Sequence, residues 1–376
     1  MTDANGKRLQ IGPAVIGPGC PVYVVAEAGV NHDGQVGVAR ELIHAAADAE
    51  ADAVKFQVFS AERVVTRNAP AVAYQRRAVQ ATTQYQILSR LELTRDEFAD
   101  LAAYAGQCGV EFLATPFAIE DLEFLVSIGV RAIKLASTDI INGPLLDAAA
   151  ETGLPVIGST GAADYNEVAA AVKRLKRPGA GPLALLHCIS SYPTGELDAN
   201  LGAIDTLARA FDCVSGFSDH TESLTIGGYA AAAGARIIEK HLTLDRNRPG
   251  PDHAFSLEPG QMAKYIHGVR YAEQLLGDGA ITIGQSEYEV RELARGSVVA
   301  ARDIHAGETL IESMLTIKRS GGGITPADLG LLVGRQATAE IPADTPIQWD
   351  AVSPIKPPEP RRTKKKSRGH VEAIRR

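Results

Sequence analysis

The sequence predicts a parallel (β/α)8 barrel, because two patterns alternate along most of its length. Short apolar runs of strand length recur eight times, and an amphipathic, alanine-rich stretch with helical spacing follows nearly every one. The runs are apolar almost throughout, which is typical of parallel strands that are covered on both faces. The eight predicted strands are residues 22–28, 53–58, 110–114, 132–136, 155–158, 183–188, 213–217 and 236–241. A doubly wound open sheet is the competing interpretation.

Helices are predicted between these runs, and several of them end at a glycine, as helices prefer to do. The predicted helices include residues 36–50, 119–128, 144–151, 165–175 and 223–233, and Gly129, Gly153 and Gly234 close three such stretches. The second and third strands are farther apart than the others. The intervening residues 61–91 include Tyr74, Gln75, Arg76, Arg77, Gln84 and Tyr85. They form either a lid over the barrel mouth or a surface excursion with its own helix.

Polar side chains gather at the C-terminal end of every predicted strand. Such groups are costly to bury without partners, and the active site of a (β/α)8 barrel lies at this rim. The rim residues are Glu27, Lys55, Gln57, Thr115, Lys134, Ser137, Ser159, Thr160, Ser190, Ser191, Ser218, Asp219, His220, Glu239, Lys240 and His241. Packing alone does not explain why polar residues occur at the C-terminal end of all eight predicted strands. The pattern therefore favours the barrel over the open sheet.

Two histidines, His220 and His241, close the last two strands beside carboxylates. If these strands are neighbours, two imidazoles converge at one end of the sheet. Together with oxygen ligands they suit Mn, Zn, Fe or Co, with open positions left for substrate or water. The alternative is that each histidine is a hydrogen-bonded structural residue.

Two lysines, Lys55 and Lys134, lie inside otherwise apolar strands and need an anionic partner. The nearby hydroxyls of Thr115, Ser137, Ser159 and Ser218 suit phosphate or carboxylate oxygens. The residues therefore predict a small, doubly anionic substrate beside a metal. The structural alternative is an internal salt bridge to Glu27 or Asp219. No glycine-rich phosphate loop occurs, so a nucleotide is not indicated.

Composition narrows the class of protein. The chain has 376 residues, 45% of them hydrophobic, and a net charge of −7. Its last 21 residues hold nine Lys or Arg and two Glu, so this tail carries +7 and the body −14. The tail, residues 356–376, is predicted to be disordered, and an acidic body argues against nucleic-acid binding. No run is long and apolar enough to span a membrane, no signal peptide is evident and the four cysteines are scattered, so we expect a cytoplasmic protein with free thiols.

These residues lie within motifs that match a known family. The motifs are AEAGVNHDG at 26–34, VKFQ at 54–57, ATPF at 114–117, IKLAS at 133–137, LHC at 186–188, GFSDH at 216–220, EKH at 239–241 and PGPD at 249–252. From about residue 23 to residue 341 the chain resembles the sialic acid synthases. These enzymes condense phosphoenolpyruvate with an open-chain, N-acylated mannosamine-type sugar, such as N-acetylmannosamine, and release phosphate.

The resemblance implies a role for each part of the rim. His220 and His241 would hold a divalent cation, Mn²⁺ or Mg²⁺, that acts as a Lewis acid on the sugar aldehyde. The implied phosphoenolpyruvate site is Lys55, Thr115, Lys134, Ser137, Ser159 and Ser218, and the implied sugar site is Glu27, Gln57, Asp139, Ser190, Tyr192, Asp252 and Arg319. Glu27, Lys55, Lys134 and Asp252 would be the catalytic residues. Glu239 lies two residues before His241, and we interpret it as an orienter of the metal site.

The chain is predicted to have a second domain. The expected boundaries are a barrel at 1–276, a linker at 277–295, a small domain at 296–355 and the basic tail at 356–376. The small domain resembles the antifreeze-like (SAF) domain of this family. There it crosses to the partner subunit, and an arginine at the position of Arg319 reaches the N-acyl group of the sugar. A homodimer with a swapped C-terminal domain is the implied working unit.

Two departures from the family pattern leave the acceptor open. Asp139 replaces a Glu that is typical of bacterial N-acetylmannosamine-using members, and Ser190 replaces a frequent Asn. The acceptor could be N-acetylmannosamine, its 6-phosphate, or a diacetamido-trideoxy hexose leading to legionaminic or pseudaminic acid. A metal-dependent aldolase or another phosphoenolpyruvate-using barrel is an alternative enzyme. A non-catalytic sugar-binding or ice-binding-like protein is the non-enzymatic alternative.

Overall fold

The computed structural model describes residues 8–72, 76 and 82–354. The chain divides into two compact units, Met1–Gly279 and Ala280–Arg376. The predicted disordered tail lies outside the described residues, as do Tyr74, Gln75 and Arg77 of the predicted lid. Every helix in the described ranges is too short or too polar to cross a membrane.

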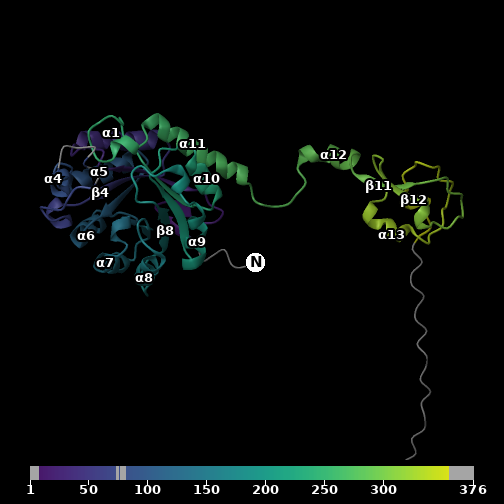
Figure 1. Cartoon of the computed structure of the whole chain (residues 1–376), viewed down its shortest axis with the longest axis horizontal. Helices are drawn as coiled ribbons and strands as arrows, with labels where there is room; N and C mark the ends of the chain where they lie inside the picture. Colours follow the sequence, from purple (N-terminus) through teal and green to yellow (C-terminus); the bar gives the residue numbers. More distant parts are fainter. Residues whose placement is uncertain (1–7, 73–75, 77–81, 355–376) are drawn as a thin grey trace, which may run out of the picture. The chain divides into compact units, whose positions relative to one another are not determined.

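The first unit is the predicted barrel (Figure 1). Its eight strands are β3 (Tyr23–Gly29), β4 (Ala53–Val58), β5 (Glu111–Pro116), β6 (Ile133–Leu135), β7 (Val156–Ser159), β8 (Leu183–Cys188), β9 (Val214–Asp219) and β10 (Ile237–His241). They form one sheet in the order β5-β4-β3-β10-β9-β8-β7-β6, with every paired neighbour parallel. The end strands β5 and β6 also lie against each other, so the sheet nearly closes on itself. The barrel interpretation is confirmed, and the open sheet is excluded.

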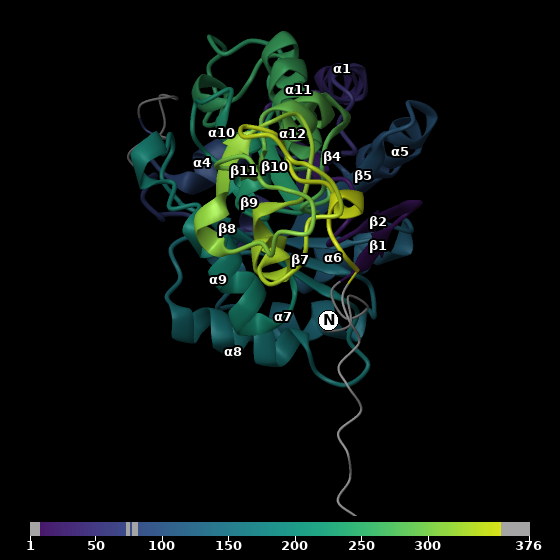
Figure 2. The ribbon, with the colours of Figure 1, turned by 90° about the vertical axis from the view of Figure 1, so that its right-hand side faces the viewer.

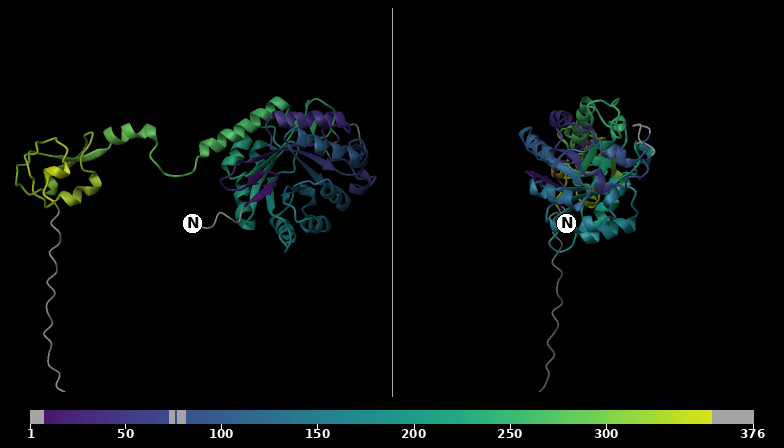
Figure 3. Two further views of the ribbon diagram at one scale, coloured as in Figure 1. Left: turned by 180° about the vertical axis from the view of Figure 1, so that it is seen from behind. Right: turned by 90° about the vertical axis from the view of Figure 1, so that its left-hand side faces the viewer.

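A helix follows each strand, and the helices lie around the strands (Figures 1 and 3). They are α1 (Val36–Asp48), α5 (Arg95–Gln107), α6 (Ile119–Ser127), α7 (Gly143–Glu151), α8 (Tyr165–Leu175), α9 (Gly202–Phe211), α10 (Ile226–Ala232) and α11 (Pro259–Leu276). Local sequence sets where they begin. Thr94 and Asp164 form capping boxes with Glu97 and Glu167, which satisfy backbone N–H groups at the starts of α5 and α8.

A hairpin that the sequence did not predict closes the N-terminal end of the barrel. Its strands are β1 (Leu9–Ile11) and β2 (Ala14–Ile16), which pair antiparallel (Figure 2). The hairpin places Leu9, Ile11 and Ile16 in one buried cluster with inward-facing strand residues such as Leu113 and Ile157. Strands of three residues are too short to give a periodic pattern, which explains the omission. The opposite end of the barrel is left for polar groups.

The segment between β4 and β5 carries short helices of its own, α2 (Ala61–Val64) and α4 (Gln84–Leu88). A small buried cluster supports it, formed by Val30, Phe59, Ala71, Ile87 and Leu91. The segment therefore has helices of its own, and several of its residues also line the cavity at the C-terminal end of the barrel.

The second unit has a separate core. It contains α12 (Tyr288–Leu293), β11 (Gly296–Ala300), β12 (Leu315–Arg319) and α13 (Leu329–Leu332), and β11 pairs antiparallel with β12 (Figure 1). Its buried cluster includes Val298, Leu310 and Ile347. Short 3₁₀ turns span Gln285–Glu287, Glu312–Met314, Pro326–Asp328 and Trp349–Ala351 in this unit, and Ser137–Asp139, Glu196–Asp198 and His253–Phe255 in the barrel.

Candidate active site

A cavity of about 890 Å³ opens among the C-terminal ends of the barrel strands and the loops that follow them. It is lined by all fourteen of the barrel residues that the sequence predicted for the site: Glu27, Lys55, Gln57, Thr115, Lys134, Ser137, Asp139, Ser159, Ser190, Tyr192, Ser218, His220, His241 and Asp252. Arg319 is the predicted site residue that comes from the second unit. It is the last residue of β12, and its side chain is exposed.

Strand register brings residues far apart in the sequence to one level of the barrel. His241 pairs with Glu27, and Glu27 pairs with Lys55, across three adjacent strands. Side chains alternate along a strand, so Glu239 and His241 both reach the cavity.

Lys240 lies between them and faces the other way. Its Nζ donates to Asp219 Oδ2 at 2.9 Å and lies over the ring of Tyr265 on α11. Two predicted rim residues, Asp219 and Lys240, therefore tie the strands to the helices and do not line the cavity. Of the two partners that the structural alternative named for the buried lysines, Asp219 is therefore not one, whereas Glu27 does pair with Lys55.

Two buried lysines share two buried carboxylates on the cavity floor. Lys55 Nζ lies 2.5 Å from Glu27 Oε2 and 3.8 Å from Glu239 Oε2. Lys134 Nζ lies 3.5 Å from the same Glu239 oxygen and donates to Ser159 Oγ at 2.8 Å. All four charged side chains are buried. Sequence reasoning placed Glu239 at the metal, but its contacts are with the lysines and with Ser218, whose Oγ donates to Glu239 Oε1 at 3.1 Å.

The pKa values of these groups follow from their surroundings. Burial raises the pKa of Glu27, and Lys55 only partly offsets this. Burial lowers the pKa of Lys134, whereas two nearby carboxylates outweigh burial at Lys55 and raise its pKa. Glu239 is also buried, but the two lysines outweigh that effect and lower its pKa. The floor therefore holds Lys55 and Glu239 charged, and Glu27 closer to its neutral form.

Hydroxyl groups converge beside Lys134 around a glycine. Ser137 Oγ accepts a hydrogen bond from Gly161 N at 3.0 Å. A methyl group on Gly161 would lie 2.3 Å from Ser190 Oγ and 2.9 Å from Ser137 Oγ. The missing side chain thus lets the hydroxyls of Ser137 and Ser190 approach the backbone closely, and the neighbouring Ser159 hydroxyl contacts the ammonium group of Lys134. This is suitable chemistry for a phosphate or carboxylate.

The two predicted metal ligands lie side by side, with ring centroids 5.4 Å apart. The Nδ1 of His220 is 2.9 Å from the carbonyl oxygen of Ile189. If Nδ1 carries the proton of that bond, Nε2 keeps its lone pair for a ligand. The pKa of His241 is well below its usual value, because of burial and then of neighbouring positive charge, so this ring is neutral. Its buried Nδ1 has no hydrogen-bond partner among the described residues.

This donor set fits a divalent cation in part. Asp252 Oδ2 lies 3.7 Å from His241 Nδ1. Within residues 8–72, 76 and 82–354, no three His, Cys, Asp or Glu side chains converge as a ready-made metal site. The chain therefore offers two imidazoles, and the remaining ligands would be oxygens of substrate or water.

A carboxyl group and a thiol lie close to the two histidines. Burial raises the pKa of Asp252 to about 7. Cys188, which the sequence suggested only as a free thiol, has its sulfur 3.7 Å from His220 Nδ1. Burial favours a neutral His220, but Cys188 outweighs it and raises the pKa of the histidine.

Sequence reasoning missed the apolar wall of the cavity. It is formed by side chains from the β4–β5 segment and adjoining loops: Val30, Val64, Val65, Val72, Ile87, Leu88, Leu91 and Phe117. Asn142 was also missed. Its Nδ2 donates to Asp139 Oδ1 at 3.0 Å, which fixes the direction of that carboxylate on the cavity wall. Apolar residues in an insertion carry no signal that distinguishes a ligand wall from a packing contact.

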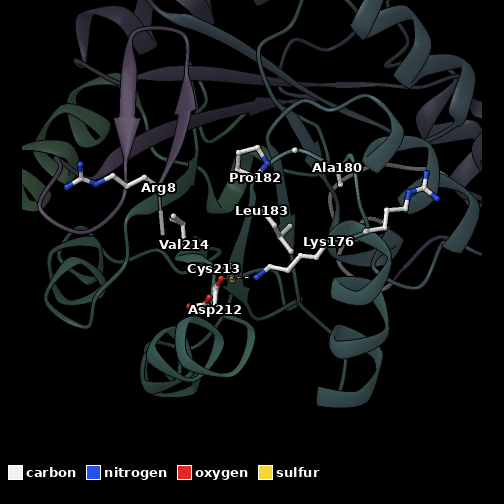
Figure 4. A pocket seen from close by; sticks show the side chains of 10 residues that line it. Arg8, Lys176, Ala180, Pro182, Leu183, Asp212, Cys213 and Val214 are labelled. Atoms are coloured by element: carbon white, nitrogen blue, oxygen red, sulfur yellow. Dashed lines mark hydrogen bonds between the residues drawn. The ribbon is translucent and has the colours of Figure 1, made fainter. Parts of the chain in front are cut away.

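A smaller cavity of about 260 Å³ lies at the N-terminal end of the barrel and is lined by Arg8, Lys176 and Arg177 (Figure 4). Lys176 Nζ donates to the carbonyls of Phe211 and Asp212, at 2.7 and 2.8 Å. Arg177 pairs with carboxylates of α7. These contacts already satisfy Lys176 and Arg177, so the cavity does not rival the C-terminal one as an active site.

Comparison with known proteins gives matches that cover most of the chain. The NeuB family model matches residues 42–281, and the SAF domain model matches residues 295–353. An N,N'-diacetyllegionaminic acid synthase of Legionella pneumophila is 38% identical, covering 88% of this chain and 94% of that protein. An N-acetylneuraminate-9-phosphate synthase of Mus musculus is 33% identical, covering 88% and 93%. The crystal structure of an N-acetylneuraminic acid synthetase from Leptospira borgpetersenii, in complex with citrate, is 39% identical with a TM-score of 0.70, covering 76% and 96%.

Proposed function

Because the chain belongs to the NeuB family, we propose that it is a nonulosonic acid synthase that condenses phosphoenolpyruvate with an open-chain, N-acylated amino sugar and releases phosphate. One observation carries this proposal. A buried lysine and hydroxyl pocket, suited to a small anion, lies in the same cavity as two histidines and the carboxylate of Glu27.

Phosphoenolpyruvate would occupy the side of the cavity formed by Lys134, Ser137 and Ser159. Lys134 and the hydroxyls would bind the phosphate, and Lys55, with Thr115 3.2 Å from its Nζ, would bind the carboxylate. These groups are held by one another before substrate arrives. Little ordering is then needed on binding, and that favours catalysis by positioning.

The sugar would lie toward His241 and Asp252, with its hydroxyls near Glu27 and Gln57, whose Nε2 donates to Glu27 Oε1 at 2.9 Å. His220 and His241 would hold Mn²⁺ or Mg²⁺, which when bound would polarise the aldehyde oxygen as a Lewis acid. In the condensation, the enol carbon of phosphoenolpyruvate forms a bond to the aldehyde carbon. Water adds to the cationic carbon left behind, and phosphate departs as its carbon–oxygen bond breaks.

Glu27 would act as the general acid and general base in these reaction steps. Its pKa is raised by burial, and its carboxyl contacts both Lys55 and Gln57. A carboxyl group that is easily protonated can give a proton to the new alkoxide and can accept one from the incoming water. Lys55 and Lys134 would keep phosphate and carboxylate charge neutralised throughout.

For the acceptor, the apolar wall supports a diacetamido-trideoxy hexose over N-acetylmannosamine or its 6-phosphate. Such a sugar has a methyl group at C6 in place of the hydroxymethyl group, and it carries a second acetyl methyl. Both would pack on apolar side chains such as Val65 and Leu88. A 6-phosphate would need another cation. Arg63 lines the cavity but pairs with the buried carboxylate of Asp121.

We further propose that the working unit is a homodimer in which the SAF domain of one subunit completes the cavity of the other. Support comes from the resemblance and from the exposed position of Arg319 at the end of β12. In that arrangement Arg319 of the partner subunit would bind the N-acyl group.

The deciding experiment measures phosphate release from phosphoenolpyruvate with Mn²⁺ and each of four acceptors. These are N-acetylmannosamine, its 6-phosphate and the two diacetamido-trideoxy hexoses. We expect release with a diacetamido-trideoxy hexose. Release with N-acetylmannosamine instead would support the same reaction but overturn the argument from the apolar wall. Cleavage of a nonulosonic acid without phosphate turnover would favour an aldolase. If no acceptor causes phosphate release, the proposal that the protein is a synthase is wrong.

A further inference from the structure

We propose that Asp33 and His253 are positioning residues, which hold Asp252 at the sugar end of the cavity. This inference rests on the proposed function, because it assigns Asp252 a contact with the acceptor. Neither Asp33 nor His253 lines the cavity. Their contacts connect the loop that carries Asp252 to the turn that follows β3.

The imidazole of His253 is the centre of this connection. His253 is fully buried and directly follows Asp252 in the chain. Its Nε2 lies 3.0 Å from Asp33 Oδ1, and its Nδ1 lies 2.7 Å from Thr243 Oγ1. The carboxylate requires the proton on Nε2, which fixes the orientation of the ring. Because Thr243 lies at the beginning of the same loop, the ring joins both ends of the loop to the β3 turn.

The backbone at Asp33 supports this reading. Asp33 has a φ of 53°, in the left-handed region that few non-glycine residues adopt. Such strain persists where the surroundings or a function require it. Here the carboxylate makes two contacts across the gap between loops, with His253 through Oδ1 and with Arg248 Nη2 through Oδ2 at 3.0 Å.

A second set of bonds carries the constraint to Asp252 itself. Ser256 Oγ donates to the carbonyl oxygen of Asp252 at 2.6 Å. Asn31 Nδ2, from the same turn as Asp33, lies 2.9 Å from Ser256 Oγ and 2.9 Å from the carbonyl oxygen of Leu242. Asp252 is thus held on one side by its neighbour His253 and on the other by Ser256. Its carboxylate lies 3.7 Å from His241, where a small displacement would remove it from the acceptor.

The test measures acceptor binding without turnover. Phospholactate, which lacks the nucleophilic double bond, replaces phosphoenolpyruvate, and the dissociation constant of the sugar that the wild type uses is measured by calorimetry with Mn²⁺. The variants are Asp33→Ala and Asp33→Asn, each alone and combined with Asp252→Ala. Asp33 is less buried than His253, and circular dichroism checks that each variant folds.

We expect Asp33→Ala to weaken sugar binding about tenfold, whereas phospholactate binding changes less than twofold. Asp33→Asn keeps an oxygen that accepts from His253 and should restore most of the affinity. In the Asp252→Ala background, Asp33→Ala should have no further effect, because it acts through Asp252. Asp212→Ala is the matched control. Asp212 also has a left-handed backbone, with a φ of 46°, at the far end of the barrel, and its replacement should leave sugar binding unchanged.

Three results would overturn the proposal: unchanged sugar binding in Asp33→Ala, an equal loss in Asp33→Asn, or a loss that persists in the Asp252→Ala background. The last would mean a general structural role. Phosphate release by the wild type tests the proposed function separately. If the wild type releases no phosphate, both the proposed function and the positioning role of Asp33 and His253 are overturned. If it does release phosphate but any of the three results is observed, only the positioning role is overturned.

Discussion

Glu239 offers the sharpest test of the charge arrangement on the cavity floor. Its buried carboxylate lies between Lys55 and Lys134 and accepts a hydrogen bond from Ser218. We infer that it holds the two lysines in place until an anionic substrate takes over. Glu239→Gln removes the charge but keeps an oxygen that can accept from Ser218, so it isolates the electrostatic contribution.

The expected cost follows from the burial of the pair. Removing one partner of a buried ion pair typically destabilises a protein by about 3–5 kcal/mol. For a domain of this size each kcal/mol lowers the melting temperature by about 2–4 °C, so we expect a decrease of roughly 6–20 °C. Burial already lowers the pKa of Lys134, so this lysine can release its proton and limit the loss. A lysine with a depressed pKa in the folded state destabilises the protein most at pH values where it is charged. The stability difference between Glu239→Gln and the wild type should therefore grow as the pH falls from 9 to 6.

Phosphoenolpyruvate should rescue the variant. A ligand at about a hundred times its dissociation constant stabilises a protein by about 2.7 kcal/mol. In Glu239→Gln the substrate no longer competes with a carboxylate for the lysines, so its affinity and the gain in melting temperature should exceed those of the wild type. Thermal denaturation followed by circular dichroism, with and without phosphoenolpyruvate, measures both effects.

The control is Glu111→Gln, which removes a partly buried carboxylate at the other end of the barrel, 3.5 Å from Arg131. Glu111→Gln should lower the melting temperature less than Glu239→Gln does. It should leave the increase in melting temperature caused by phosphoenolpyruvate the same as in the wild type. If Glu239→Gln melts like the wild type, or gains no more from the substrate, Glu239 is not the counter-ion of the two lysines.

Four further substitutions and one control test the rest of the site by steady-state kinetics of phosphate release. His220→Ala should abolish turnover with Mn²⁺ present, and retained activity would remove this residue from the metal site. Lys134→Ala should mainly raise the KM for phosphoenolpyruvate. Gly161→Ala should do the same, because its methyl group would lie too close to the surrounding hydroxyls. Gly202→Ala is the control, because Gly202 has open space around it and its replacement should leave this KM unchanged. Arg319→Ala should raise the KM for the sugar more than that for phosphoenolpyruvate, and the reverse would contradict a site shared between subunits.

The barrel was predictable because each of its strands is a separate local signal. Apolar runs such as β8 and β10 differ from the helices around them in both period and length. The location of the site was predictable for a related reason. Lys55 and Lys134 are conspicuous within apolar strands, and parallel strands place all such residues at one rim.

Partner choice within the rim was not predictable in the same way. Asp219 and Glu239 are both acids at strand ends, but one faces the helices and bonds Lys240, whereas the other faces the cavity. Which face a side chain occupies depends on the register of the whole barrel, and a shift of one residue exchanges the faces. The roles of Asp33 and His253 were hidden for another reason, because 220 residues separate them in the sequence.

The buried polar atoms of the cavity indicate where ligands belong. Buried polar atoms in folded proteins normally have hydrogen-bond partners. Among the buried atoms of cavity residues, His241 Nδ1 has no hydrogen-bond partner in the described part of the chain, whereas Glu27 Oε2 and Glu239 Oε2 are paired with the lysines of the floor. The two carboxylate oxygens face Lys55 and Lys134, which phosphoenolpyruvate would engage, and the histidine nitrogen faces Asp252 at the sugar end. The same cavity thus has buried polar groups that a ligand can engage at both of its ends, as expected if two substrates, and not one, complete it.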